Sequence, residues 1–272
     1  MHALKNWPIE ARSRITGVLT DIDDTLTTEG AITPDALAAL GALKAAGLPV
    51  IAITGRPVGW SAPFACDWPV DAIVAENGAV ALLSCQKDRH GFLDGNKLLS
   101  KLYRQDKQTR ASNFARMQGV LQRIERELPG VRRANDSPGR ETDIAVDHSE
   151  FAHLDEAQIA AVVALMKSEG MHATVSSIHI NGWYGDHNKL VGARWIVQHL
   201  WQRDLNAEMA HWVYVGDSTN DQLMFEAFAN SVGVANIARF VHKLAHLPRY
   251  VTQGERGAGF AEVVAAILAG RN

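Results

Sequence analysis

Short apolar runs that end in small or acidic residues constrain the fold of this chain most. Four of them are Ile15–Thr20, Pro49–Ile53, Ala72–Ala75 and Trp212–Val215. Continuous apolar runs of this length are typical of parallel strands that are buried on both faces. Parallel strands need crossover connections, and leucines at helical spacing in Thr33–Ala46 predict a crossover helix between the first two runs. The sequence therefore predicts an α/β core with a parallel sheet.

The pattern changes between about residues 83 and 186. The elements predicted there are a helix, the two strands of a hairpin, a second helix and a last strand: Ser112–Leu128, Val131–Ala134, Asp143–Asp147, Asp155–Glu169 and Ala173–Ile180. Beyond them the alternation of helices and strands resumes: Leu190–Arg203, Trp212–Val215, Gln222–Phe228, Ser231–Val234 and Phe260–Leu268. We therefore expect the 272 residues to form a discontinuous Rossmann-like core (about 1–82 and 187–272) with an inserted α+β domain (about 83–186).

Composition and charge exclude several classes of function. The chain has 27 Lys and Arg against 30 Asp and Glu, so no basic field would attract nucleic acid. It has no long uncharged apolar stretch, and the charges among its first residues predict no signal peptide. Its two cysteines, Cys66 and Cys85, lack the spacing of a zinc site. We expect a cytoplasmic protein whose partner is a small molecule, not nucleic acid or a membrane; the sequence does not determine the oligomeric state.

An apolar strand runs directly into three carboxylates in the segment Val18–Thr27. Asp21, Asp23 and Asp24 follow the strand within four residues. Ligands bind at the carboxyl ends of parallel strands, and three acids this close repel one another unless a cation or a proton intervenes. A divalent metal is therefore the natural partner of this segment. Taken alone, the segment fits an acidic, solvated turn about as well.

A second strand end carries two further acids. Asp217 and Asp221 follow the apolar run that ends at Gly216. If the chain turns into a helix there, the two carboxylates lie one turn apart and can converge on one cation. Two acidic strand ends at one edge of a parallel sheet favour a metal site over two unrelated turns.

Two further segments suit the binding of phosphate. A strand-end hydroxyl at Thr54 is followed by Gly55, whose amide is accessible, and by Arg56. Lys189, just before a predicted helix, could act as a point charge on the same oxygens. Each signal is weak alone, because a strand-end Thr is more often a helix cap and a Lys is usually a solvated surface charge.

In order, the segments DIDDT, ITGR, HNK and GDSTND resemble the four motifs of the haloacid dehalogenase-like (HAD) hydrolase superfamily. The insert between the second and third segments resembles, by its position, the type C2 cap of this superfamily. Residues 75–79 (AENGA) and 232–236 (VGVAN) resemble segments of the IIB-like branch, which includes sugar phosphatases and phosphomannomutase. One departure is Asp24, where many members of that branch have Gly.

The resemblance implies a role for each core motif. Asp21 would be the nucleophile that becomes an aspartyl-phosphate, and Asp23 would protonate the leaving alcohol and then activate water. Mg²⁺ would bind at Asp21, the Asp23 backbone carbonyl and Asp217, with Asp221 nearby. The candidate site residues of the core are therefore catalytic (Asp21, Asp23), phosphate-binding (Thr54, Gly55, Arg56, Lys189) and metal-binding (Asp21, Asp23, Asp217, Asp221).

The inserted domain is expected to select the substrate. Strand alternation places Ser177, His179, Asn181 and Trp183 on one face. That face could hydrogen-bond a sugar, with Trp183 stacking on it, although a solvated sheet face explains the same pattern nearly as well. Arg140, Glu141 and Asp143 are either substrate contacts on the predicted hairpin or an ordinary charged turn: the sequence allows both.

The sequence as a whole predicts a Mg²⁺-dependent phosphatase that hydrolyses a small phosphate monoester, in particular a sugar phosphate. A phosphomutase is the enzymatic alternative, because it would use the same aspartyl-phosphate. A non-catalytic phosphosugar-binding protein is the alternative from a different class. Competent residues at all four motifs favour an enzyme.

Overall fold

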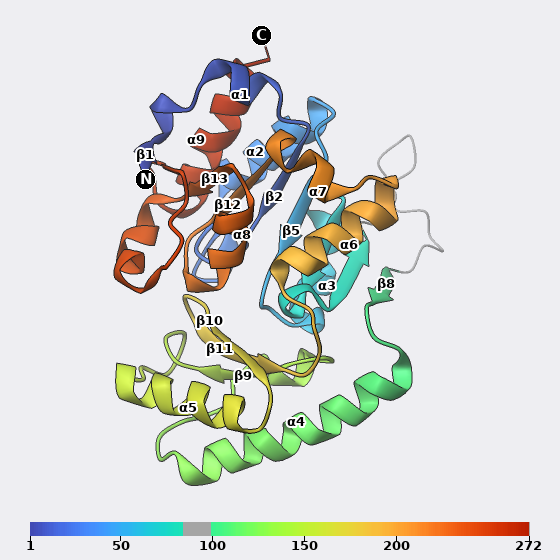
Figure 1. Ribbon diagram of the computed structural model, residues 1–272, viewed down its shortest axis with the longest axis vertical. Coiled ribbons are helices and arrows are strands. Elements are labelled where there is room, and N and C mark those ends of the chain that lie inside the picture. Colours follow the sequence, from blue (N-terminus) through green and yellow to red (C-terminus); the bar gives the residue numbers. More distant parts are fainter. Residues whose placement is uncertain (84–98, 272) are drawn as a thin grey trace.

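The computed structural model describes residues 1–83 and 99–271, so Cys85 lies outside the described residues. Within these ranges nine strands form the main sheet: β1 (His2–Ala3), β2 (Gly17–Thr20), β5 (Val50–Ile53), β6 (Ala72–Ala75), β7 (Val80–Leu83), β8 (Ser100–Tyr103), β12 (Trp212–Gly216), β13 (Asn230–Gly233) and β14 (Tyr250–Val251). Their order is β1-β14-β13-β12-β2-β5-β6-β7-β8 (Figure 1). Neighbours from β1 to β6 pair in parallel, whereas β7 and β8 are antiparallel additions.

Helices cover both faces of this sheet. They are α1 (Ile9–Ser13), α2 (Pro34–Ala45), α3 (Val58–Asp67), α6 (Lys189–Trp201), α7 (Leu205–Glu208), α8 (Gln222–Ala227) and α9 (Arg256–Ala269). Alternate strand residues enter opposite hydrophobic clusters: Val18 and Ala52 pack with α2, α3 and α9, whereas Leu19 and Ile51 pack with α6 and α8. This two-sided burial explains the continuous apolar runs and confirms the predicted fold class.

The predicted core elements agree closely with the structure. The helix expected over Thr33–Ala46 is α2, with Thr33 at its N-cap and Gly47 beyond its end at φ +68°. Helix α3, which contains Pro63, was not predicted. Strand β8 falls inside the expected insert but pairs with β7 in the main sheet. The domain boundaries themselves stay a prediction.

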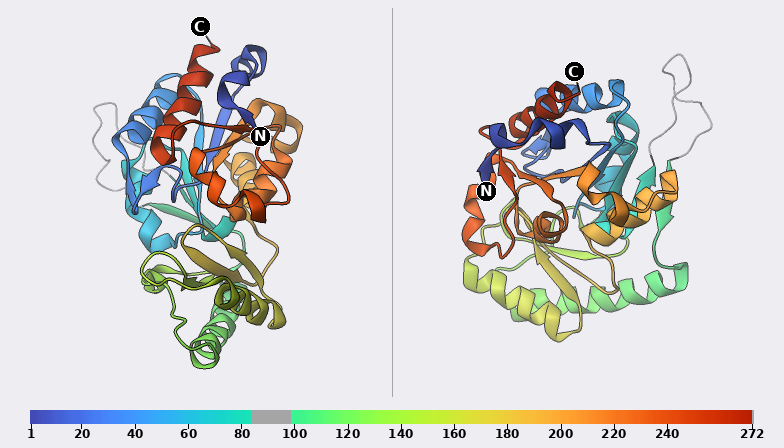
Figure 2. Two further views of the ribbon diagram at one scale, coloured as in Figure 1. Left: turned by 90° about the vertical axis from the view of Figure 1, so that its left-hand side faces the viewer. Right: turned by 45° about the horizontal axis from the view of Figure 1, so that its top comes forward.

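The insert, or cap, has a small antiparallel sheet in the order β10-β11-β9, where β9 is Ile144–Asp147, β10 is His172–Val175 and β11 is His179–Trp183. Helices α4 (Lys107–Glu127) and α5 (Glu156–Ser168) pack on one face of it. Figures 1 and 2 show these elements as a separate layer beside the core. The antiparallel α+β insert is therefore confirmed.

Two expectations for the cap were wrong in detail. Val131–Ala134 forms no strand and contributes only a single bridge, Arg133 to Val146, because the following residues wind into the 3-10 turn Ser137–Gly139 (η3). The single strand expected over Ala173–Ile180 is two strands, β10 and β11. The hydroxyl of Ser176 accepts hydrogen bonds from the amides of Ile178 and His179 and so stabilises a turn between them.

A short hairpin follows the acidic segment of the core; its two-residue strands are β3 (Thr27–Thr28) and β4 (Ala31–Ile32). Its turn residues Glu29 and Gly30 have φ values of +51° and +78°, as a type I′ turn requires. Across residues 1–83 and 99–271, no helix combines the length and the apolar character that a membrane span needs.

The first turn of α6 packs directly on backbone. A Cβ atom added at Gly192 would lie 2.6 Å from the Cα of Gly78, and one at Gly78 would lie 2.2 Å from the Asn188 carbonyl oxygen. Gly78 also has φ +103°, which other residues rarely adopt. This contact places the N-terminus of α6, and with it Lys189, against the loop that follows β6.

We predict that Gly192→Ala lowers the free energy of unfolding by about 1–3 kcal/mol through overpacking, although Ala favours helix. The matched control is Gly119→Ala on α4, where an added Cβ meets nothing within 4 Å. There the same change should stabilise by about 0.5–1 kcal/mol. Denaturant unfolding of both variants measures the difference; equal effects would contradict the packing described here.

Candidate functional site

The site lies where three neighbouring parallel strands end. Asp21 follows β2, Thr54 follows β5, and Asp217 follows β12. Because β12, β2 and β5 are adjacent and parallel, their carboxyl ends meet at one edge of the sheet. The cap approaches the same edge, since the Thr219 hydroxyl donates to the Val175 carbonyl oxygen on β10 over 2.5 Å.

A cluster of three buried carboxylates forms the centre of the site. Asp21, Asp217 and Asp221 each offer an oxygen, and these oxygens lie within 4.8 Å of one another. Burial raises the pKa of Asp21 to about 7, opposed by Lys189 and reinforced by Asp221. Burial together with Asp21 and Asp221 raises the pKa of Asp217 well above its usual range. Holding these groups ionised therefore calls for additional positive charge.

Lys189 supplies one such charge. Its Nζ lies 2.8 Å from Asp21 Oδ1 and 2.7 Å from Asp221 Oδ1, and the residue is 2% exposed. Burial by itself would lower the pKa of Lys189, but the attraction of the Asp21 and Asp221 carboxylates is larger, and the net effect is a raised pKa. Asn188 caps α6 by accepting a hydrogen bond from the Val191 amide over 2.9 Å, which determines where the lysine side chain begins.

Asp221 and Asp217 differ in how their oxygens are used. Asp221 Oδ1 accepts from Lys189 and from the Tyr214 hydroxyl, and Oδ2 accepts from the amides of Asp217 (2.9 Å) and Ser218 (3.1 Å). Among the described residues, Asp217 Oδ2 accepts only from Asn236, over 3.2 Å. Asp217 Oδ1 is buried and has no hydrogen-bond partner within the described chain.

An unpartnered, buried carboxylate oxygen beside a second carboxylate fits a divalent cation, which binds such oxygens. The cluster could therefore hold a metal ion. Asp217 and Asp21 have the oxygens best placed for it, whereas Asp221 is occupied with holding Lys189 and its own loop.

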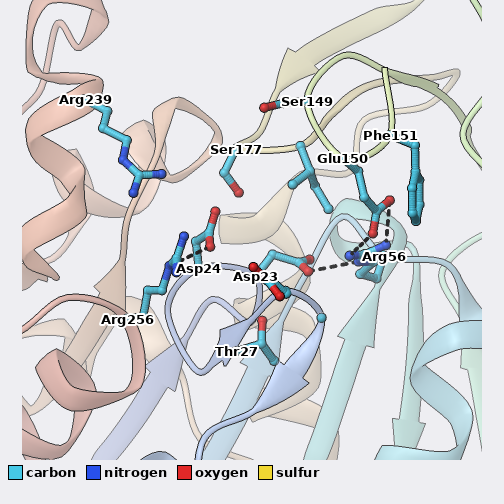
Figure 3. A pocket seen from close by; sticks show the side chains of 13 residues that line it. Asp23, Asp24, Thr27, Arg56, Ser149, Glu150, Phe151, Ser177, Arg239 and Arg256 are labelled. Carbon is cyan, nitrogen blue, oxygen red and sulfur yellow. Dashed lines mark hydrogen bonds and ion pairs between the residues drawn. The ribbon is translucent and has the colours of Figure 1, made fainter. Parts of the chain in front are cut away.

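The side chain of Asp23 lies outside this cluster and contacts Arg56 instead. Arg56 Nε lies 2.9 Å from Asp23 Oδ1, and the Thr54 hydroxyl lies 3.5 Å from Asp23 Oδ2. The other end of the Arg56 guanidinium contacts the cap carboxylate of Glu150 at 2.8 Å (Figure 3). It also contacts a second cap carboxylate, Asp136, at 3.3 Å. Arg56 is 4% exposed and thus links Asp23 to the cap.

The cap loop that carries Glu150 is built around one carboxylate. Asp147, at the end of β9, accepts hydrogen bonds from four successive backbone amides: Ser149, Glu150, Phe151 and Ala152. Burial alone would raise the pKa of Glu150, but hydrogen bonds from His179 and Arg56 lower it to about 2. Glu150 is therefore held ionised against Arg56.

Further contacts between core and cap surround Gly55. Its carbonyl oxygen accepts from Arg140 Nη1 (3.0 Å) and Asn181 Nδ2 (3.2 Å), and both side chains also contact Asp143. Nearby, the fully buried carboxylate of Glu76 accepts from the amides of Glu141 (3.0 Å) and Thr142. Arg140 and Asp143 are thus buried at the contact between core and cap, not part of a solvated turn.

The three residues singled out on β11 are also buried. His179 contacts Glu150 and Arg140, and Asn181 contacts Gly55. Trp183 is 2% exposed, donates its indole N–H to the His187 carbonyl oxygen, and stacks on the rings of His172 and His187. Their face is therefore not a solvated one.

A cavity of about 460 Å³ lies between core and cap. Asp23, Arg56 and Arg239 from the core and Glu150 and Ser177 from the cap are among the described residues that line it (Figure 3). The buried carboxylate cluster and Lys189 do not line it, and neither do the three β11 residues discussed above. Ser177 is the one member of the predicted polar face that does.

Several residues around the site had no role in the sequence interpretation. Glu76 and Asn236 lie in segments that the sequence singled out, AENGA and VGVAN, but as family markers only. Glu150, Arg239 and Arg256 had no signal, because they come close to the site only through the packing of the cap and of the C-terminal loops.

Known proteins are similar to this chain in part of its sequence and in its fold. Residues 18–105 match a family model described as haloacid dehalogenase-like hydrolase. No curated protein sequence matches the chain significantly. A Thermoplasma acidophilum protein has a similar structure, with a TM-score of 0.68, 15% identity, and coverage of 93% of this chain and 98% of the other.

Two other solved structures are also similar to this chain. One is a sucrose-phosphatase from Synechocystis in complex with sucrose and phosphate (TM-score 0.63, 17% identity, 93% and 98% coverage). The second is a HAD subclass IIB sugar phosphatase (TM-score 0.59, 14% identity, 92% and 96% coverage). At these identities the structures establish the shared fold. The family model matches the part of the chain that carries the first two motif segments, and the solved structures of similar fold include a subclass IIB member.

Proposed function

We propose that this protein is a Mg²⁺-dependent phosphatase that hydrolyses a small phosphate monoester, a sugar phosphate or a derivative of one. The observation that carries the proposal is the arrangement around Asp21. Its carboxylate lies beside Lys189 and beside Asp217, which has a buried oxygen that no donor of residues 1–83 and 99–271 contacts. The similarity in fold to a sucrose-phosphatase and to a subclass IIB sugar phosphatase supports the substrate class.

The chemistry would proceed in two displacements. In the first, an oxygen of Asp21 forms a bond to phosphorus while the bond from phosphorus to the leaving oxygen breaks, and Asp23 gives that oxygen a proton. In the second, Asp23 takes a proton from water as the water attacks phosphorus, and the bond to Asp21 breaks to release inorganic phosphate. Mg²⁺ held by Asp21 and Asp217, with the backbone carbonyl of Asp23, would neutralise charge on the phosphoryl oxygens.

The remaining residues would prepare these steps. Lys189 would offset the charge of Asp21 and the phosphoryl group, while Asp221 holds Lys189 in place. Thr54 and the Gly55 amide would bind phosphoryl oxygens. The contacts of Arg56 favour a role in orienting Asp23 at the mouth of the cavity, because Nε already bonds to that carboxylate.

We predict that Asp21→Asn abolishes release of inorganic phosphate from aryl phosphates and sugar phosphates in the presence of Mg²⁺. The substitution preserves size but removes the nucleophile, so the rate should fall by several orders of magnitude while the protein still folds. Circular dichroism and phosphate release measure the two effects. A matched control is Asp67→Asn, at the exposed end of α3, which should keep full activity.

Three results would contradict this mechanism in different ways. Full activity of folded Asp21→Asn protein would exclude the covalent intermediate. Transfer of phosphate within a sugar bisphosphate pool, without release, would indicate a phosphomutase. Tight binding of phosphosugars with no turnover would indicate a binding protein.

We further predict that Mg²⁺ stabilises the protein and that Asp217 is required for it. At about 100 times its Kd, Mg²⁺ should add about 2.7 kcal/mol to the free energy of unfolding and raise Tm by several degrees. Asp217→Asn should remove this increase. Chelation should abolish activity, and Ca²⁺ should restore it poorly because its looser coordination misplaces the nucleophile.

Asp221→Asn serves as the comparison for the metal experiment. It weakens the acceptor of Lys189 and Tyr214, so it should lower Tm without any metal, by an amount that reflects about 1–3 kcal/mol. Thermal scans with and without Mg²⁺ separate the two effects. An undiminished Mg²⁺ shift in Asp217→Asn, or undiminished activity in excess chelator, would exclude the proposed metal site.

A further inference from the structure

The cavity between core and cap is placed to receive the leaving group of the substrate. It is lined by Asp23, the proposed proton donor, but not by the carboxylate cluster or Lys189, which would surround the phosphoryl group. A volume of about 460 Å³ suits a small metabolite. The charges that line this cavity therefore indicate what the alcohol part of the substrate carries.

The three arginines that line the cavity are used unequally. Arg56 is paired with Asp23 and Glu150. The Nε of Arg256 lies 3.0 Å from Asp24 Oδ1. Arg239 is exposed and, within residues 1–83 and 99–271, its side chain makes no hydrogen bond or ion pair. It is therefore a positive charge available to a ligand in the cavity.

The pairing of Arg256 also accounts for the departure at Asp24. Asp24 has φ +54°, a left-handed conformation that glycine adopts with the least strain, and this explains why Gly suits the position. An Asp there adds a negative charge, and Arg256 offsets it. The pair leaves no net charge, so Arg239 determines the charge on that side of the cavity.

The loop that carries Arg239 is anchored to the catalytic loops. Arg239 ends the 3-10 segment Ala235–Arg239 (η6), in which Asn236 is 2% exposed. The Asn236 side chain donates to the Asp24 carbonyl oxygen (2.9 Å) and to Asp217 Oδ2 (3.2 Å), and it accepts from the Arg256 amide (2.9 Å). One buried amide thus connects the Arg256 backbone, and the short segment that ends at Arg239, to the acidic segments.

The polarity of the cavity follows from this arrangement. Arg239 and Arg256 lie on one side, near Asp24 and Ser177, and Arg56 lies on the other (Figure 3). Glu29, an exposed carboxylate in the turn of the β3–β4 hairpin, also lines the cavity. A ligand with a negative group is therefore attracted to the Arg239 side and repelled at the hairpin.

We propose that the preferred substrate carries a second anionic group, a carboxylate or a second phosphate, on its alcohol part, and that Arg239 binds this group. This inference rests on the proposed phosphatase function and narrows its substrate class. Arginine recognises carboxylate and phosphate with paired hydrogen bonds, whereas a neutral sugar would leave the charge of Arg239 unused.

The test measures inhibition of p-nitrophenyl phosphate hydrolysis by matched compounds, so it does not depend on which of them is turned over. 3-Phosphoglycerate and glycerol 3-phosphate differ only in a carboxylate against a hydroxymethyl group. Glucose 1,6-bisphosphate and glucose 1-phosphate differ in a second phosphate. The doubly anionic member of at least one pair should bind about tenfold more tightly, and the pair that shows this identifies the group.

Arg239→Gln should reduce that preference to about twofold or less, with little change for the singly anionic compounds, because only the contact to the second group is lost. Arg14→Gln, an exposed arginine that does not line the cavity, makes the same change in net charge and should keep the preference. Equal binding within both pairs in the wild-type protein would overturn the inference, as would equal effects of the two variants. The proposed function itself would fail differently, by an absence of Mg²⁺-dependent p-nitrophenyl phosphate hydrolysis.

Discussion

The burial of like charges at one edge of the sheet is the constraint on which the rest of this site depends. Asp21, Asp217 and Asp221 lie within 4.8 Å of one another, out of contact with bulk water. One lysine and a set of backbone amides offset part of their repulsion. The remaining deficit of positive charge is what a divalent cation would offset.

The cap depends on the same edge through a second set of buried ion pairs. Arg56 holds Asp23 with one side of its guanidinium and Glu150 with the other, so the residue proposed to transfer the proton is connected to the cap. The carbonyl oxygen of Gly55 and the carboxylate of Glu76 accept further hydrogen bonds from cap residues. A buried charge that lost these partners would be costly, which favours the contact between core and cap described here.

The sequence predicted the core well because its signals are local. Apolar runs, helical spacing and strand-end acids each depend on a few neighbouring residues, and β6 was found with the predicted bounds. The cap was predicted less accurately. A single bridge at Arg133 replaces one expected strand, because a proline-containing turn follows it. A turn after Val175 divides another expected strand, because the Ser176 hydroxyl stabilises it. Neither turn changes the hydrophobicity of the segment, so the apolar pattern does not reveal it.

The sequence by itself determined the α/β core with an α+β insert. It also determined the residues that end the three strands at the candidate site, because each of these residues follows a continuous apolar run. Only the tertiary structure decided which charges are paired. It buried Trp183 against two histidines, joined Arg56 to Glu150, and left Arg239 without a partner in the described chain. Pairing depends on residues far apart in the chain that packing brings within a few ångströms, and no local pattern records it.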